Sequence, residues 1–440
     1  MNKFFKLEER GTTVSKEFIA GLTTFLSMAY IIFVNPNTLA ASGMDTGAVF
    51  TATILAAAIG TLIMGLYANF PVALAPGMGM NAFFSYTVVL LMGYSWQQAL
   101  AGIFVSGILF IILSATGLRE LIINSIPVSL KHAVGTGIGF FIAFLGLQNS
   151  GIIVNNDATL VGVGNFTDPN VLITVIGLVV TLILLVRKTP AAIFIGMIIT
   201  AIVGIFLGVV ELPTQIIAPI PSLEPTFGAL FEALPTVFTA EMIPVIFSFL
   251  FVDFFDTAGT LMAVGSRAGL VNEKGHLVDG DKALLADSTA TVIGSVLGTS
   301  STTSFVESLT GVEAGGRTGL TSVFTALCFV VMLFCSGLLS VVTSAVTAPA
   351  LITVGILMAS SLGDIEWKNL ETSIPSFVTI IMMVLGYSIA EGIASGFLLY
   401  PIMMVAARPG LSTGSHVEWK EGLPPPPHTH TPPPPLLTAL

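Results

Sequence analysis

Long apolar segments separated by short polar ones dominate the chain. Most have about 20 residues, the length that an α-helix needs to cross the hydrocarbon core of a bilayer. Turn residues, prolines and charges delimit fourteen of them, at 15–36, 47–69, 71–92, 97–117, 126–148, 169–187, 191–210, 240–265, 283–299, 301–316, 317–339, 341–362, 374–388 and 391–407. The last two are short, and a hairpin that crosses only partly is the alternative there. The pattern predicts an all-α polytopic membrane protein with fourteen transmembrane segments.

The basic residues test this segmentation, because cytoplasmic loops collect Lys and Arg. If both termini are cytoplasmic, all fifteen Lys and Arg fall on the inner side. The outer loops at 149–168 and 211–239 contain acidic residues but no cation. A missed or extra segment in the middle would break this pattern. We therefore expect a multi-pass protein of a bacterial plasma membrane with both termini inside.

Composition agrees with this picture. Of 440 residues, 54% are hydrophobic and 9% are charged, against about 25% charged in soluble domains. The first residues, MNKFFKLEERGTTVSKE, have mixed charge and no cleavage-site pattern, which favours a cytoplasmic tail over a secretory signal. So few cations leave no basic surface for nucleic acid. The expected partners are small molecules and the lipid bilayer, and homodimerisation stays open.

The chain also repeats itself. ATILAAAIGTLIMG at 52–65 has an echo in ADSTATVIGSVLG at 286–298, seven segments later. An odd number of crossings per repeat turns the second copy upside down. The pattern therefore predicts a 7+7 inverted repeat, which places a binding site near the midplane of the membrane.

The segment after each copy is irregular. FPVALAPGMGMNAFF contains Pro71, Pro76, Gly77 and Gly79, and GTSSTTSFVESLTGVEAGGRTG is rich in Ser, Thr and Gly. Irregular backbone at membrane depth survives only where it is buried in protein or lines a wet cavity. We therefore expect two broken segments facing a polar ligand. The alternative is that the glycines only let helices pack closely, as we expect for AVGTGIGFF at 133–141.

Two carboxylates lie in the middle of the segment SFLFVDFFDTAGTLMAVG. Asp253 and Asp256 are the only charged residues between Met242 and Gly265, and each costs about 2.5 to 3.5 kcal/mol at the centre of a bilayer. Lipid exposure is therefore excluded. A spacing of three puts both on one face of the helix, so one polar stripe can face the cavity of the broken segments. A hydrogen-bond network that only ties helices together is the alternative.

Four motifs resemble one known family. GLTTFLSMAYIIFVNP at 21–36, APGMGMNAFF at 75–84, DFFDTAGT at 253–260 and ESLTGVEAGGRTGLTS at 307–322 are similar to signatures of the AzgA-type guanine/hypoxanthine/adenine permeases, a branch of the nucleobase cation symporters. The resemblance runs from about residue 5 to residue 408. It implies proton-coupled uptake of purines, with core-domain segments 1–4 and 8–11 (15–118 and 240–339) and gate-domain segments 5–7 and 12–14 (119–215 and 340–407). The Pro-rich end at 408–440 has no counterpart and is expected to be an extended cytoplasmic tail.

The resemblance also implies site residues. Carried onto this sequence, the substrate-binding positions are Gly79, Asn81, Asp253, Asp256 and one glutamate, for which Glu307 ranks ahead of Glu313. An oxopurine offers N–H donors as well as acceptors on its edge, so carboxylates can accept from it while an amide donates. Its flat face suits an aromatic wall, for which Phe83 and Phe305 are the leading candidates.

Coupling requires a group that gains and loses a proton. The five histidines lie at segment ends, in loops or in the tail, so the role falls to carboxylates: Asp253, Asp256 and Glu313, with Glu307 in the same cluster. Burial and mutual repulsion favour a shared proton in such a cluster. Sodium coupling is the alternative, because acidic and hydroxyl oxygens also bind a hard cation.

Other classes fit less well. A channel needs a continuous polar lining, whereas the polar residues here concentrate at one depth. A membrane-embedded enzyme needs a nucleophile or a metal set, and the sequence has no HExxH, CxxC or GxxxxGK[ST] motif. We therefore expect no enzyme, no cofactor and no metal site. Uracil or xanthine remains an alternative substrate on the same architecture, whereas paired carboxylates disfavour an anion such as sulfate.

Overall fold

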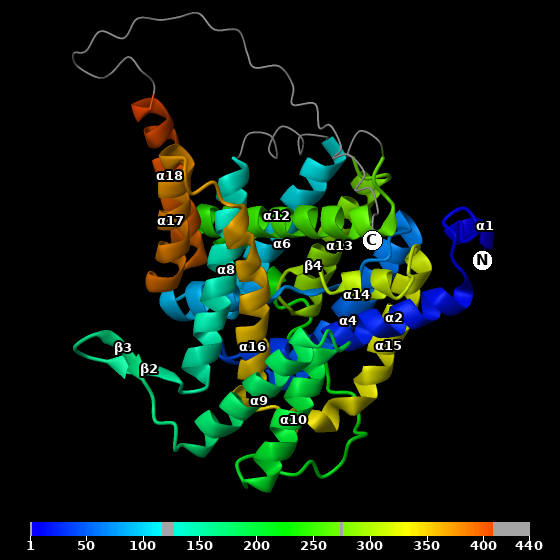
Figure 1. The fold of residues 1–440 in the computed structure, drawn as a ribbon, viewed down its shortest axis with the longest axis horizontal. Helices are drawn as coiled ribbons and strands as arrows, with labels where there is room; N and C mark the ends of the chain where they lie inside the picture. Colours follow the sequence, from blue (N-terminus) through cyan, green and yellow to red (C-terminus); the bar gives the residue numbers. More distant parts are fainter. Residues whose placement is uncertain (1, 117–126, 273–275, 408–440) are drawn as a thin grey trace, which may run out of the picture.

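Helices form nearly all of the regular structure (Figure 1). The computed structural model describes residues 2–116, 127–272 and 276–407; the predicted Pro-rich tail at 408–440 lies outside the described residues. The first half contains α1 (Asn2–Phe5), α2 (Val14–Met28), α3 (Ile31–Ala40), α4 (Thr46–Ile63), α5 (Met78–Ala82), α6 (Trp96–Thr116), α8 (Val128–Asn149), α9 (Pro169–Val186) and α10 (Ala192–Phe206), with the π-helical segments η1 (Met64–Ala68) and η2 (Phe83–Leu91).

The second half continues in the same way. It contains α11 (Leu230–Ala233), α12 (Met242–Ala268), α13 (Gly280–Leu297), α14 (Ser308–Glu313), α15 (Gly319–Met332), α16 (Ser344–Met358), α17 (Leu370–Leu385) and α18 (Ile389–Ala406), with the 3-10 segments η3 (Leu234–Thr236), η4 (Leu333–Val341) and η5 (Ala359–Asp364). Two antiparallel strand pairs complete the described part: β1 (Leu74–Pro76) with β4 (Thr302–Ser304), and β2 (Ile153–Asn156) with β3 (Leu160–Val163).

Several helices have the length and composition of membrane spans. In the described part of the chain, nine are long and apolar enough to cross a bilayer, and three shorter apolar helices accompany them at Met78–Leu91, Ala192–Phe206 and Leu370–Leu385. Large apolar side chains face outward from them: Val186 is 83% and Phe206 is 85% exposed, which suits lipid rather than water. The prediction of a helical polytopic membrane protein is confirmed. The count of fourteen crossings and the inverted repeat stay predictions.

Both irregular segments are interrupted, as their prolines, glycines and hydroxyl residues predict. In the first, strand β1 leads into the five-residue helix α5 and then into η2. In the second, strand β4 leads into the six-residue helix α14. The two strands pair with each other, with Leu74 opposite Ser304 and Pro76 opposite Thr302. This pairing satisfies backbone groups that a broken helix leaves without partners.

The first predicted segment, 15–36, is not one continuous helix. It divides at Ala29 and Tyr30 into α2 and α3, and α3 extends to Ala40. The backbone tightens at this point, because the N–H groups of Ile32 and Phe33 donate to the carbonyls three residues earlier. The break places the side chain of Tyr30 in the interior, where it is fully buried.

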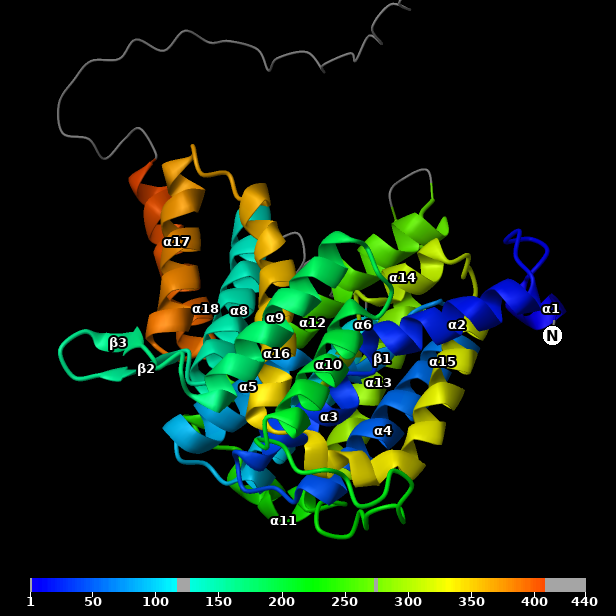
Figure 2. The same ribbon diagram turned by 60° about the horizontal axis from the view of Figure 1, so that its bottom comes forward.

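The helices pack as two groups. The helices α2, α4, α6, α12, α13 and α15 pack on one another, and α8, α9, α10, α16, α17 and α18 do the same. Figures 1 and 2 show α17 and α18 side by side at the edge of the molecule opposite to α1, with the β2–β3 hairpin projecting from the body. The groups touch where α2 packs on α10 and α12 packs on α18. The short helices α3 and α5 also pack on α16 and α8 of the second group.

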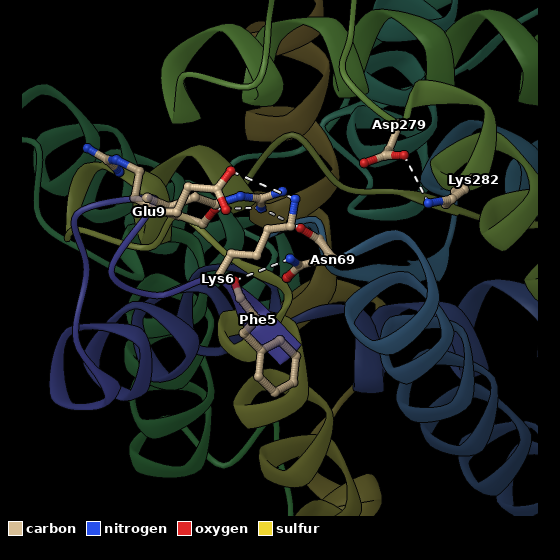
Figure 3. A network of polar contacts seen from close by, with 8 residues as sticks. Phe5, Lys6, Glu9, Asn69, Asp279 and Lys282 are labelled. Carbon is tan, nitrogen blue, oxygen red and sulfur yellow. Dashed lines mark hydrogen bonds and ion pairs between the residues drawn. The ribbon is translucent and has the colours of Figure 1, made fainter. Parts of the chain in front are cut away.

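One asparagine ties the N-terminal segment to the first group. Asn69 has a left-handed backbone with φ of 55° at the end of η1, a conformation that Asn tolerates better than most residues. Its amide donates to the carbonyl of Phe5 at 3.3 Å (Figure 3), and its side-chain oxygen accepts from the N–H of Gly319 at 2.8 Å. The start of the chain, the end of η1 and the start of α15 are thereby held together.

Candidate functional site

A cavity lies where the two broken segments meet α12. Its walls come from residues 77–80 and 303–307, from Val252, Asp256 and Thr260 of α12, from Tyr30, and from Ile138, Val354 and Met358 of α8 and α16. Four predicted site residues line it: Gly79, Asp256, Phe305 and Glu307. A wider hollow at the ends of α8, α9 and α16 is open and contains none of the predicted site residues. The cavity at the broken segments is therefore the candidate site.

Gly79 allows α5 to approach α8. A Cβ atom at this position would lie 2.6 Å from Cγ2 of Ile138, closer than carbon atoms can approach without a shift. Next to it, the N–H of Gly77 donates to the carbonyl of Ser301 at 2.9 Å. The first broken segment is therefore fixed to the second on one side and in close contact with α8 on the other.

Glu307 is held from one side by a tyrosine. Its Oε1 accepts the hydroxyl hydrogen of Tyr30 at 2.6 Å, a short bond. Glu307 directly precedes α14 and is half-buried. The prediction from the sequence did not include Tyr30, since one Tyr in the apolar stretch SMAYIIF gives no sign of its partner.

The two aspartates of α12 point to different surroundings. Asp256 lines the cavity. Asp253 is only 1% exposed, and its Oδ2 accepts from Ser301 at 2.7 Å and from Thr291 at 2.9 Å. Three residues rotate a helix by about 300° and so leave about 60° between the side chains. This angle suffices to direct one carboxyl at the cavity and the other at α13 and β4.

A further buried carboxyl, that of Asp287 in α13, was not predicted from the sequence. It is fully buried, and its Oδ1 accepts from Ser304 at 2.7 Å. Within the described chain, neither Oδ2 of Asp287 nor Oδ1 of Asp253 has a hydrogen-bond partner. The sequence does mark this residue, because Asp287 is the single charged residue of the predicted segment 283–299. Charge in an apolar segment also marked Asp253 and Asp256.

Asn81 and Phe83 lie behind the cavity wall. Both are fully buried. The amide of Asn81 donates to Oδ1 of Asn35 at 3.1 Å, and Asn35 in turn donates to Thr53 and Thr299. The ring of Phe83 packs edge-on against Phe249, with centroids 4.8 Å apart. Neither residue belongs to the lining, whereas Phe305 provides an aromatic ring to it.

Glu313 lies at a distance from these groups in the fold. It is the last residue of α14, its side chain is 60% exposed, and it pairs with Arg267 at 3.5 Å. The structure therefore brings Glu307 and Asp256 to one cavity, and it places Glu313 on the surface.

The groups that line the cavity are complementary to a small neutral ligand with N–H groups. Two carboxyl groups face it, and a carboxylate accepts hydrogen bonds while a protonated carboxyl can also donate. The hydroxyls of Thr260 and Thr303 add further donors and acceptors, and Phe305 adds a flat apolar wall. Two carboxylates repel an anion. The arrangement offers binding.

Comparisons with known proteins identify the family. The model of the Permease family (Xan_ur_permease) matches residues 15–395. The guanine/hypoxanthine permease PbuG of Bacillus subtilis (strain 168) is 56% identical over 414 residues, which cover 92% of this chain and 94% of that protein. The adenine permease AdeP of Escherichia coli (strain K12) is 45% identical over 405 residues, covering 92% of this chain and 90% of that protein.

A solved structure shares the fold. The transmembrane domain of the cyanobacterial bicarbonate transporter BicA superposes with a TM-score of 0.61 at 15% identity, covering 90% of this chain and 97% of that chain. At this identity the likeness concerns the fold alone.

Proposed function

Because this chain belongs to the Permease family (Xan_ur_permease), we propose that it is a secondary active transporter that imports purine nucleobases by proton symport. Hypoxanthine and guanine are the proposed main substrates, and adenine is a further one. The observation that carries the proposal is the cavity between the broken segments, to which Asp256 and Glu307 present carboxyl groups. Carboxylates in such a cavity can accept the ring N–H groups of a purine and can take up a proton.

The purine assignment is supported by similarity and by chemistry together. A relative that is 56% identical is a guanine/hypoxanthine permease, and one that is 45% identical is an adenine permease. The ring of Phe305 beside Glu307 provides a surface on which a flat base can stack. The proposed roles are substrate contact for Gly79, Asp256, Phe305 and Glu307, and proton coupling for Asp253.

We further propose fourteen crossings in a 7+7 inverted repeat. The antiparallel pairing of β1 with β4 supports it, because the broken segment of an inverted copy runs in the opposite direction. The packing of the helices into two groups supports a core domain at 15–118 and 240–339, and a gate domain at 119–215 and 340–407. The location proposed is a bacterial plasma membrane with both termini cytoplasmic.

Gly79→Ala is expected to lower the rate of purine uptake at least 5-fold, because its Cβ would collide with Ile138 where the proposed domains meet, and overpacking costs about 1 to 3 kcal/mol. Gly135→Ala is the matched control: a Cβ there meets no atom within 4 Å. Initial uptake rates in vesicles, divided by the amount of transporter, measure both. Equal rates for the two variants would show that the contact at Gly79 has no part in transport.

Uptake into proteoliposomes tests the proposed function. When the outside is more acidic than the lumen, labelled hypoxanthine should accumulate in the proteoliposomes. Excess guanine or adenine should compete with its uptake. Uracil, xanthine and sulfate should compete weakly or not at all. A sodium gradient without a pH difference should not drive uptake. Stronger competition by uracil or xanthine, or drive by sodium alone, would replace the proposal with the corresponding alternative.

A further inference from the structure

Tyr30 joins the first segment of the chain to the wall of the cavity. The residue lies between α2 and α3 and is 0% exposed, so packing on all sides fixes its ring. Its hydroxyl reaches Glu307 across a sequence separation of 277 residues. Both residues line the cavity. A ligand in the cavity therefore meets Glu307 in the orientation that Tyr30 imposes.

The direction of this hydrogen bond determines which carboxyl oxygen of Glu307 can bind a ligand or a proton. A tyrosine hydroxyl has one hydrogen, and here it is donated to Oε1. Oε1 thus acts as an acceptor, and a proton taken up by the carboxyl belongs on Oε2. The hydroxyl of Tyr30 occupies Oε1 and leaves Oε2 on the side of the cavity that Glu307 lines. Oε2 is therefore the oxygen available to a ligand.

We infer that Tyr30 is a positioning residue that makes Glu307 selective for 6-oxopurines over 6-aminopurines. The inference rests on the proposed purine transport. A 6-oxopurine carries an N–H donor at ring position N1, where adenine carries an acceptor. While the Glu307 carboxyl is ionised, its fixed Oε2 accepts the N1–H of hypoxanthine or guanine, and it meets a lone pair on adenine. A carboxyl free to rotate would discriminate less, because it could turn towards the amino group of adenine instead.

Other groups near Glu307 do not perform this function. Of the two helices that pack on α14, α12 presents Asp256 to the same cavity. Arg267 of α12 pairs with Glu313, and Glu17 of α2 accepts from the N–H of Arg317 at 2.9 Å. Those groups lie at the far end of α14. Tyr30 is the residue whose hydrogen bond to the Glu307 carboxyl is seen in the described chain.

Binding of hypoxanthine and adenine to the purified full-length protein tests the inference. We expect Tyr30→Phe to weaken hypoxanthine binding about 10-fold, the effect of one lost hydrogen bond to a charged group. We expect adenine binding to change less than about 2-fold, so the preference for hypoxanthine falls about 5-fold or more. A purely structural role would weaken both ligands equally. Tyr30→His, which keeps an N–H donor, should restore part of the preference.

Tyr86→Phe is the matched control. It removes a half-buried hydroxyl that accepts from the amide of Asn149 at 2.9 Å, and Tyr86 does not line the cavity. Its hypoxanthine to adenine ratio should equal that of the unmodified protein. An unchanged ratio in Tyr30→Phe, or a larger loss for adenine, would overturn the inference while leaving purine transport intact. Failure of the unmodified protein to bind any purine would instead refute the proposed function.

Discussion

Glu307→Gln is expected to lower hypoxanthine uptake about 100-fold, while Glu313→Gln leaves it within about 2-fold. Glutamine has nearly the same shape as glutamate, and its oxygen can still accept from Tyr30. Its amide NH₂ then faces the cavity in place of Oε2. The NH₂ of the introduced glutamine would then face the N–H donors of the purine, and the contact between residue 307 and the purine would change from attractive to repulsive.

Glu313 is the appropriate comparison because it has the same side chain and lies at the opposite end of α14 from Glu307. It is exposed and forms a surface ion pair with Arg267, and such pairs contribute about 0 to 1 kcal/mol. Uptake of labelled hypoxanthine at equal membrane levels of the two variants distinguishes them. Full activity of Glu307→Gln together with loss in Glu313→Gln would exchange the proposed roles of the two glutamates.

The helices themselves follow well from the sequence. The predicted segment 169–187 corresponds to α9 at Pro169–Val186, and 391–407 corresponds to α18 at Ile389–Ala406. Apolar length and flanking prolines or charges suffice for such elements, because a helix that faces lipid must satisfy its backbone internally. The break at Tyr30 was not predicted. It depends on contacts with α14 and on the packing around one buried ring, which no local pattern encodes.

The strand pairing was also beyond prediction. Prolines and glycines indicated two broken segments, yet each strand has only three residues, and strands of this length carry no pattern of their own. Their pairing brings together Leu74 and Ser304, which are distant in sequence. Such contacts are specified by the fold of the whole chain.

For the site, charge in an apolar segment was the informative signal. It selected Asp253 and Asp256, of which Asp256 lines the cavity, and it would also have selected Asp287. Glu307 followed only from the resemblance to a known family. The charge signal could not separate Asp256 from Asp253, since the direction of each side chain depends on the neighbours that donate to it. Nor could it find Tyr30, because tyrosine is common in apolar helices and its role follows from one distant partner.

The two aspartates of α12 should give opposite phenotypes. Asp256→Asn is expected to weaken purine binding about 30-fold, since the carboxyl that faces the cavity loses its charge. Saturating purine should still accumulate in response to a pH gradient. Asp253→Asn is expected to bind purine within about 3-fold of the unmodified protein, because Asp253 does not line the cavity. It should fail to accumulate purine against a gradient.

Asparagine can replace Asp253 without loss of its hydrogen bonds. The amide oxygen of Asn can accept from Ser301 and Thr291 as Oδ2 does, and its NH₂ occupies the position of the unpartnered Oδ1. The shape is kept and the titratable group is lost. Purine binding to purified protein, measured beside pH-driven uptake in proteoliposomes, separates the two functions. Reversed phenotypes would exchange the roles of Asp253 and Asp256. Persistent pH-driven accumulation in the double asparagine variant would exclude the pair from coupling and direct attention to Asp287, the remaining buried carboxyl beside β4.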